Sequence, residues 1–114
     1  MKKILILIVL LLTGCTSNTY ISISQSEAKK MMKEEKDYII LDVRTKEEYA
    51  EGYIDGAINI PLNEIENTNK LNDKDQIIFV YCRSGNRSKQ ASEILANLGY
   101  SNIYEIGGIN TWEE

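Results

Sequence analysis

Short apolar runs recur along the chain from residue 20 onward, and polar residues separate them. Such runs, rich in Ile, Val and Tyr, are typical of buried strands. The run at 77–81 is apolar at all five positions, which predicts a strand buried on both faces. We expect five strands in all, at residues 20–23, 38–41, 57–60, 77–81 and 103–106.

Amphipathic stretches with capping signals lie between the predicted strands. Ser24 or Ser26 can begin a helix that carries Ala28, Met31 and Met32 on one face. Further helical segments are expected at residues 46–50 after a capping box of Thr45 and Glu48, at 62–66 after Pro61, and from about 86 to Gly99.

The alternation of strands and helices predicts an α/β fold. Continuous apolar runs in the strands favour a central, mostly parallel five-stranded sheet with helices on both faces. The length suits one compact core, so we expect a single domain over residues 20–114. In such sheets ligands bind beyond the carboxyl ends of the strands. Cys82 follows the strand at 77–81 directly and therefore lies at that edge.

The start of the chain has the pattern of a targeting segment. Lys2 and Lys3 precede nine consecutive aliphatic residues, Ile4 to Leu12. Nine residues of helix span roughly 14 Å, about half of a bilayer core. An export signal therefore fits this segment better than a transmembrane anchor does.

The residues at 12–15, LTGC, resemble the lipobox of bacterial lipoproteins. The resemblance implies that Cys15 is lipidated and becomes the first residue after cleavage. The chain would then divide into a lipoprotein signal peptide at 1–14, a polar lipid-anchored tether at 15–19 and the domain at 20–114. We expect an extracytoplasmic protein on a bacterial cell membrane. The alternative is an ordinary signal peptide with Cys15 beside its cleavage site.

Composition argues against several kinds of site. The net charge is −4 and the basic residues are scattered, which does not favour nucleic-acid binding. Histidine, the commonest general base and transition-metal ligand, is absent. The two cysteines lie far apart in unlike contexts, which argues against structural zinc. We expect no metal and no separate cofactor.

The loop CRSGNRS at residues 82–88 places a thiol between a buried strand and a helix. Only the thiolate is a nucleophile, and loop amides together with a helix N-terminus stabilise its charge. Gly85 allows the backbone to fold closely around the sulfur. Arg83 and Arg87 add positive charge suited to an oxyanion. The alternative is that Cys82 is an ordinary buried cysteine.

This loop resembles the active-site loop of rhodanese-like sulfurtransferases. Two further blocks resemble the same family, LDVRTKEEYAEGYIDGAINIPL at 41–62 and GGINTW at 107–112. The three blocks occur in order over residues 23–112. The resemblance implies a single-domain, three-layer rhodanese-like fold in which Cys82 is catalytic and carries sulfur as a persulfide. The substrate cradle would consist of the loop residues Arg83, Ser84, Gly85, Asn86, Arg87 and Ser88.

The implied activity is transfer of a sulfane sulfur from a small anionic donor such as thiosulfate to a thiophilic acceptor. That acceptor would be a thiol, cyanide or a protein thiol. The persulfide is the only carrier required. No general acid is needed, because the thiolate expels a group that already leaves readily.

Asp42 and Arg44 match the family's DxR signature and allow two interpretations. They could take part in catalysis, or they could form a buried pair that ties the second strand to its surroundings. We favour the structural interpretation, since most such networks support the fold. Gly107-Gly108 and Trp112 are expected to form a turn and packing contacts near the rim.

Three alternatives to a sulfurtransferase with catalytic turnover remain. A cysteine phosphatase or arsenate reductase needs Arg six positions after the cysteine, where this chain has Ser88, and Arg87 comes one position early. A sulfur carrier or a protein-binding module would need the same thiol, so the sequence leaves turnover against carriage open. The physiological donor and acceptor, the membrane and the oligomeric state are equally open.

Overall fold

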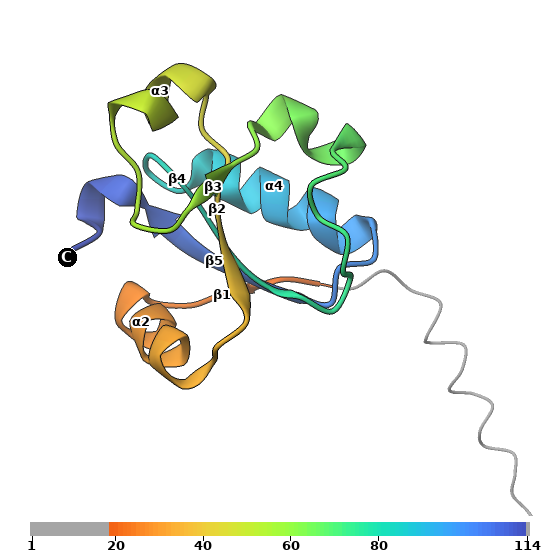
Figure 1. The fold of residues 1–114 in the computed structure, drawn as a ribbon, viewed down its shortest axis with the longest axis horizontal. Coiled ribbons are helices and arrows are strands. Elements are labelled where there is room, and N and C mark those ends of the chain that lie inside the picture. The colour runs from red at the N-terminus through yellow and green to blue at the C-terminus, as the bar shows by residue number, and fades with distance from the viewer. Residues whose placement is uncertain (1–18, 114) are drawn as a thin grey trace, which may run out of the picture.

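Five parallel strands form the centre of the domain in a computed structural model that describes residues 19–113 (Figure 1). The strands are β1 (Ile21–Ser22), β2 (Tyr38–Asp42), β3 (Ile58–Asn59), β4 (Ile77–Cys82) and β5 (Asn102–Gly108). They lie in the order β1-β5-β4-β2-β3, and every neighbouring pair is parallel. The predicted five-stranded α/β fold is therefore confirmed.

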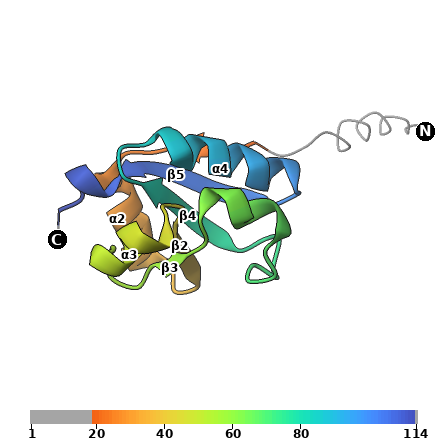
Figure 2. The ribbon, with the colours of Figure 1, turned by 90° about the horizontal axis from the view of Figure 1, so that it is seen from above.

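Helices cover both faces of this sheet (Figure 2). They are α2 (Gln25–Glu34), α3 (Lys46–Glu51) and α4 (Asn86–Asn97), with short 3₁₀ segments at Leu62–Asn67 (η2) and Ile109–Thr111 (η3). Side chains of α4 and η2 pack with one face of β4, which includes Val80 and Cys82. Side chains of α2 and α3 pack with the other face, which includes Phe79 and Tyr81. Alternate side chains of β4 therefore contribute to two hydrophobic cores, one on each face of the sheet.

The predicted caps define where two helices begin. The Ser24 side chain accepts a hydrogen bond from the Glu27 amide at the start of α2. At the start of α3, Thr45 and Glu48 each accept a hydrogen bond from the other's backbone N–H. This is the capping box expected from the sequence, and it fixes Glu48 on the side of α3 that faces the cysteine loop.

The prediction of a turn at Gly107-Gly108 is wrong, because β5 continues through both glycines. Gly108 pairs with Cys82 after a register shift between Val80 and Cys82. A Cβ on Gly108 would lie 2.6 Å from Ser84 Cα and closer still to the Arg83 carbonyl oxygen. Only a glycine therefore allows the strand to continue this close under the cysteine loop.

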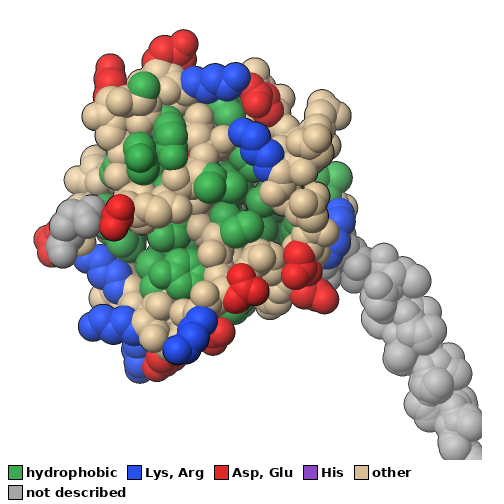
Figure 3. Space-filling model, viewed as in Figure 1, with side chains coloured by type: hydrophobic (Ala, Val, Ile, Leu, Met, Phe, Trp, Pro, Cys, Tyr) green, Lys and Arg blue, Asp and Glu red, His purple; other side chains and the backbone are tan. Residues whose placement is uncertain are grey.

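The expected signal peptide at 1–14, the expected lipidation site Cys15 and most of the expected tether lie outside the described residues. Among residues 19–113, no helix is long and apolar enough to span a membrane. On the face drawn in Figure 3, lysine and arginine side chains are interspersed with aspartate and glutamate. That face presents charge of both signs rather than a basic stripe.

Candidate active site

Cys82 is the last residue of β4 and its side chain is buried, with 1% of the residue exposed. The Gly85 amide donates a hydrogen bond to Sγ at 3.0 Å. The hydroxyl of Ser88, in the first turn of α4, lies 3.5 Å from the same sulfur. The predicted loop thus brings an amide, a hydroxyl and the N-terminus of α4 to a single thiol.

The surroundings of Cys82 act on the pKa of its thiol in opposite directions. Burial raises the pKa, because the thiolate loses its hydration. Hydrogen bonds from Ser88 and from the backbone amides at Gly85 and Ser84 lower it, and the net effect is a lowered pKa. The site therefore favours the nucleophilic form of the sulfur.

Gly85 gives the loop its shape. Its φ of +113° lies in the left-handed region that side chains rarely adopt, and it occupies the position just before α4. Asn86 is the first helical residue. The sharp reversal at Gly85 turns its N–H back towards the sulfur that precedes it by three residues.

Arg83 and Arg87 do not stand as two free charges. Arg87 donates to both carboxylate oxygens of Glu48, at 2.7 and 3.1 Å, and Arg83 Nε donates to one of them at 3.1 Å. The bond to Arg87 is the largest cause of a Glu48 pKa well below its ordinary value. The capping residue of α3 is therefore also the anion that holds both arginines. Sequence reasoning missed this second role.

Asp42 and Arg44 form a buried ion pair on the other side of β4. Arg44 Nη2 lies 2.7 Å from Asp42 Oδ2 and also donates to the Gly52 carbonyl at 2.6 Å. The Tyr81 hydroxyl donates to the same Asp42 oxygen at 2.7 Å and accepts a hydrogen bond from the Ile54 amide. These bonds join β2, β4 and the segment after α3. None of them reaches Cys82.

Glu105 is a site residue that the sequence did not indicate. It lies in β5, is 3% exposed, and accepts a hydrogen bond of 2.5 Å from Ser88. A carboxylate inside an apolar strand pattern gives no sign of which neighbour it meets. Its contact with Ser88 depends on the pairing of β5 with β4 and on how α4 packs over both.

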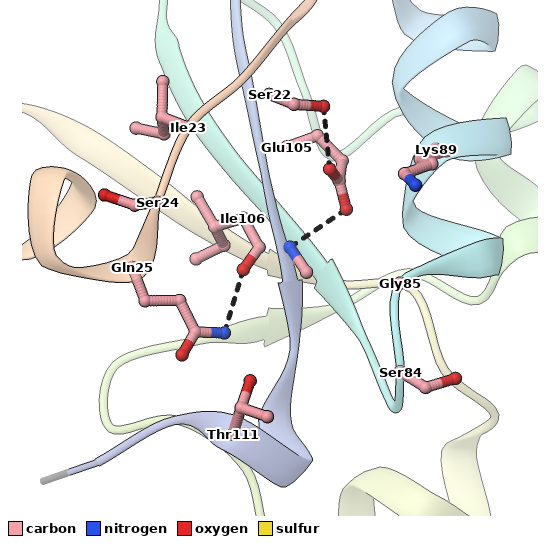
Figure 4. Close-up of a pocket in the computed structure, with 11 residues that line it drawn as sticks. Ser22, Ile23, Ser24, Gln25, Ser84, Gly85, Lys89, Glu105, Ile106 and Thr111 are labelled. Carbon is pink, nitrogen blue, oxygen red and sulfur yellow. Dashed lines mark hydrogen bonds between the residues drawn. The ribbon is translucent and has the colours of Figure 1, made fainter.

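A cavity of about 470 Å³ opens beside the cysteine loop. Its walls come from the segment joining β1 to α2, from β5 and from the start of α4 (Figure 4). Ser84 and Gly85 of the loop reach it, and Glu105 lines it from β5. Among residues 19–113, no three His, Cys, Asp or Glu side chains gather as metal ligands.

Comparison with known families agrees with this geometry. The family model described as the rhodanese-like domain matches residues 24–114. The chain belongs to the rhodanese-like domain family. The matched region includes every strand of this rhodanese-like domain except β1, together with the whole cysteine loop.

Two relatives of the domain have names that refer to sulfur. Thiosulfate sulfurtransferase PspE of Escherichia coli is 41% identical over 71 residues, 60% of this chain and 68% of that protein. YrkF of Bacillus subtilis, named as a sulfur carrier protein, is 35% identical over 79% of this chain and 49% of its own length. Two longer relatives, both named as adenylyltransferases, are matched over only 20% and 19% of their own lengths.

A solved structure shares the fold closely. The crystal structure of a rhodanese-like domain protein from Staphylococcus aureus superposes with a TM-score of 0.72 at 37% identity. The match covers 82% of this chain and 92% of that one. The rhodanese-like fold expected from the sequence is therefore confirmed.

Proposed function

We propose that this rhodanese-like domain is a sulfurtransferase that works through a persulfide on Cys82. The observation that carries the proposal is the placement of Sγ, 3.0 Å from the Gly85 amide, at the start of α4. A thiolate in this place is stabilised without any histidine. The thiosulfate sulfurtransferase PspE supports the same activity.

The cycle consists of two displacements at sulfur. The Cys82 thiolate attacks the outer sulfur of thiosulfate, the S–S bond breaks, and sulfite leaves with the electron pair. A cyanide ion or acceptor thiolate then attacks the outer sulfur of the persulfide and restores the Cys82 thiolate. Neither step needs a cofactor or a general acid.

The loop residues from Arg83 to Ser88 are proposed to receive the anionic donor. Amides at the start of α4 can donate hydrogen bonds to its oxygens, and Arg87 lies at the same end of the helix. Because Arg83 and Arg87 are both bonded to Glu48, an incoming anion shares these guanidinium groups with that carboxylate. Asp42 and Arg44 support the sheet under the loop and contact no donor.

Intact-mass spectrometry tests the proposal directly. Incubation with thiosulfate or a polysulfide is expected to add one sulfur to the chain, and treatment with cyanide to remove it. Cys82→Ser should take up none while keeping its fold by circular dichroism. Uptake by Cys82→Ser, or turnover of an aryl phosphate without persulfide formation, would reject the assignment.

Sulfur carriage without turnover is the second candidate, supported by the likeness to YrkF. Both functions load Cys82 with one sulfur, so mass alone does not separate them. Steady-state assay with cyanide or a small thiol does. A carrier releases one equivalent of thiocyanate and stops, whereas a sulfurtransferase continues for many cycles.

We further propose that the domain is held outside the cell by lipid on Cys15. The support is the sequence LTGC at 12–15 after nine aliphatic residues. Loss of residues 1–14 leaves 11 basic and 17 acidic residues. An anionic donor is then bound by the local cradle against the overall charge of the protein.

A further inference from the structure

Glu105 is a buried carboxylate that the cycle above does not use. One of its oxygens, Oε1, accepts a hydrogen bond from the Ser22 hydroxyl at 3.0 Å. The other, Oε2, accepts from the Gly107 amide at 2.9 Å and from the Ser88 hydroxyl at 2.5 Å. Figure 4 shows the carboxylate held between β1 and its own strand. Both oxygens therefore accept hydrogen bonds from neighbouring donors.

Ser88 has one hydroxyl proton and several acceptors within reach. Glu105 Oε2 is the nearest at 2.5 Å, the Gly85 carbonyl is at 2.9 Å, and Cys82 Sγ is at 3.5 Å. Because Ser88 has one hydroxyl proton and donates it to Glu105 at the shortest of these distances, it can give a thiolate only a weak hydrogen bond. When Cys82 is a thiol, the Ser88 oxygen accepts its S–H at 3.5 Å.

We propose that Glu105 sets the protonation state of Cys82 through Ser88. When Cys82 is a thiol, its S–H donates to Ser88, and Ser88 donates to Glu105. In the reactive arrangement the thiol proton has passed to water or a buffer base, and the Cys82 thiolate lies one hydroxyl away from the Glu105 carboxylate. Glu105 acts through Ser88 and is a positioning residue.

Other charged groups around the thiol are already engaged with partners. On α4, Arg87 lies near the sulfur but is bonded to Glu48 of α3. Asp42, the last residue of β2, forms an ion pair with Arg44 just after that strand. Within residues 19–113, the carboxylate left to act on Cys82 is that of Glu105, one hydroxyl away.

The cavity side of Glu105 holds one further cation. Lys89 of α4 lines the same cavity as Glu105, and the described residues show no ion pair between the two. Ser22 and Gln25 contribute only neutral groups to this wall. A carboxylate charge separated from the sulfur by one hydroxyl opposes formation of the thiolate.

The test is the pH dependence of Cys82 alkylation by iodoacetamide, followed in the full chain by mass spectrometry of the peptide that contains Cys82. Glu105→Gln keeps the shape and the acceptor oxygen but removes the charge. We expect the midpoint of its alkylation profile to fall by about one pH unit relative to the wild type. The rate at neutral pH should rise by up to about tenfold accordingly.

Two variants separate this role from a general disturbance. Ser22→Ala removes a partner of Glu105 on the side away from Ser88, and its midpoint should stay close to that of the wild type. In a Ser88→Ala background, Glu105→Gln should shift the midpoint by less than half as much, because the linking hydroxyl is gone. An unchanged midpoint in a folded Glu105→Gln protein overturns the inference, and so does an equal shift in Ser22→Ala.

The inference concerns the nucleophile of the proposed sulfurtransferase, yet its test is independent of sulfur transfer. A shifted alkylation midpoint without persulfide formation would reject the proposed function and leave the role of Glu105 intact. Persulfide formation with an unshifted midpoint would do the reverse.

Discussion

At the scale of single residues, two carboxylates from outside residues 82–88 hold the side chains of the cysteine loop. Glu48 pairs with both loop arginines, and Glu105 holds the Ser88 hydroxyl. The sequence identifies Cys82 and the loop around it, since a thiol between a buried strand and a glycine-containing turn is a local pattern. It does not identify either carboxylate partner, because each comes from an element brought near only by the fold.

The pKa of Glu48 makes a prediction about acid stability. A carboxyl group whose folded pKa is lowered contributes stability above its unfolded pKa, and loses it as pH falls towards the folded value. Glu48→Gln retains the capping geometry but loses the ion pairs. At pH 7 we expect it to lower the free energy of unfolding by about 1 kcal/mol, since Arg87 is partly exposed and Arg83 largely so.

Urea unfolding at pH 7 and at pH 3 measures this effect. The difference between wild type and Glu48→Gln should shrink at pH 3, where Glu48 of the unfolded chain is protonated, its ordinary pKa being about 4.3. Glu64→Gln, which alters a longer and more exposed contact with Lys46, is the matched control and should change stability little at either pH. An equal deficit at both pH values would contradict the ion-pair explanation.

At the scale of elements, the strands predicted from the sequence nearly match the strands of the structure. The five apolar runs correspond to β1–β5 within one or two residues at most ends, because continuous burial leaves a strong pattern in β2 and β4. The error lies at Gly107-Gly108. Paired glycines usually indicate a turn, whereas here they allow β5 to continue beneath the cysteine loop. Contact with a segment some 25 residues earlier in the chain is not encoded locally.

The close approach of Gly108 to the cysteine loop predicts that adding a single methyl group at Gly108 has a severe effect. In Gly108→Ala the new Cβ would meet the backbone at Arg83 and Ser84, so either β5 or the loop must move. We expect at least about 2 kcal/mol of lost stability, as for other overpacked sites, together with loss of sulfur uptake at Cys82. Thermal unfolding and intact-mass analysis measure the two effects.

Gly56→Ala provides the control for Gly108→Ala. Gly56 has a φ of +87°, but no atom lies within 4 Å of the position that a Cβ would take, so only backbone strain of about 1 kcal/mol is expected there. Sulfur uptake should be unchanged in that variant. If Gly108→Ala also kept full uptake, the close contact would not determine the geometry of the loop.

At the scale of the whole molecule, the domain is acidic, and the proposed anchor decides where it works. Cys15→Ser in the full-length protein removes the sulfur that would carry lipid. We expect the wild type to partition into detergent with the membrane fraction, and the variant to lose that behaviour while still forming a persulfide at Cys82. Phase partitioning with mass analysis of the N-terminal peptide measures this. A wild-type chain without lipid would reject the anchor.

The parallel direction of all five strands has a consequence for how the anchored protein would present itself. Cys82 lies at the carboxyl end of β4, whereas the chain enters the sheet at Ile21, the amino end of β1. A tether joined at Ile21 would therefore attach to the domain on the side away from the Cys82 thiol. In the anchored form proposed here, the amino ends of the strands face the membrane, and Cys82 faces away from it. Acceptors would then be reached in the surrounding fluid rather than among lipids.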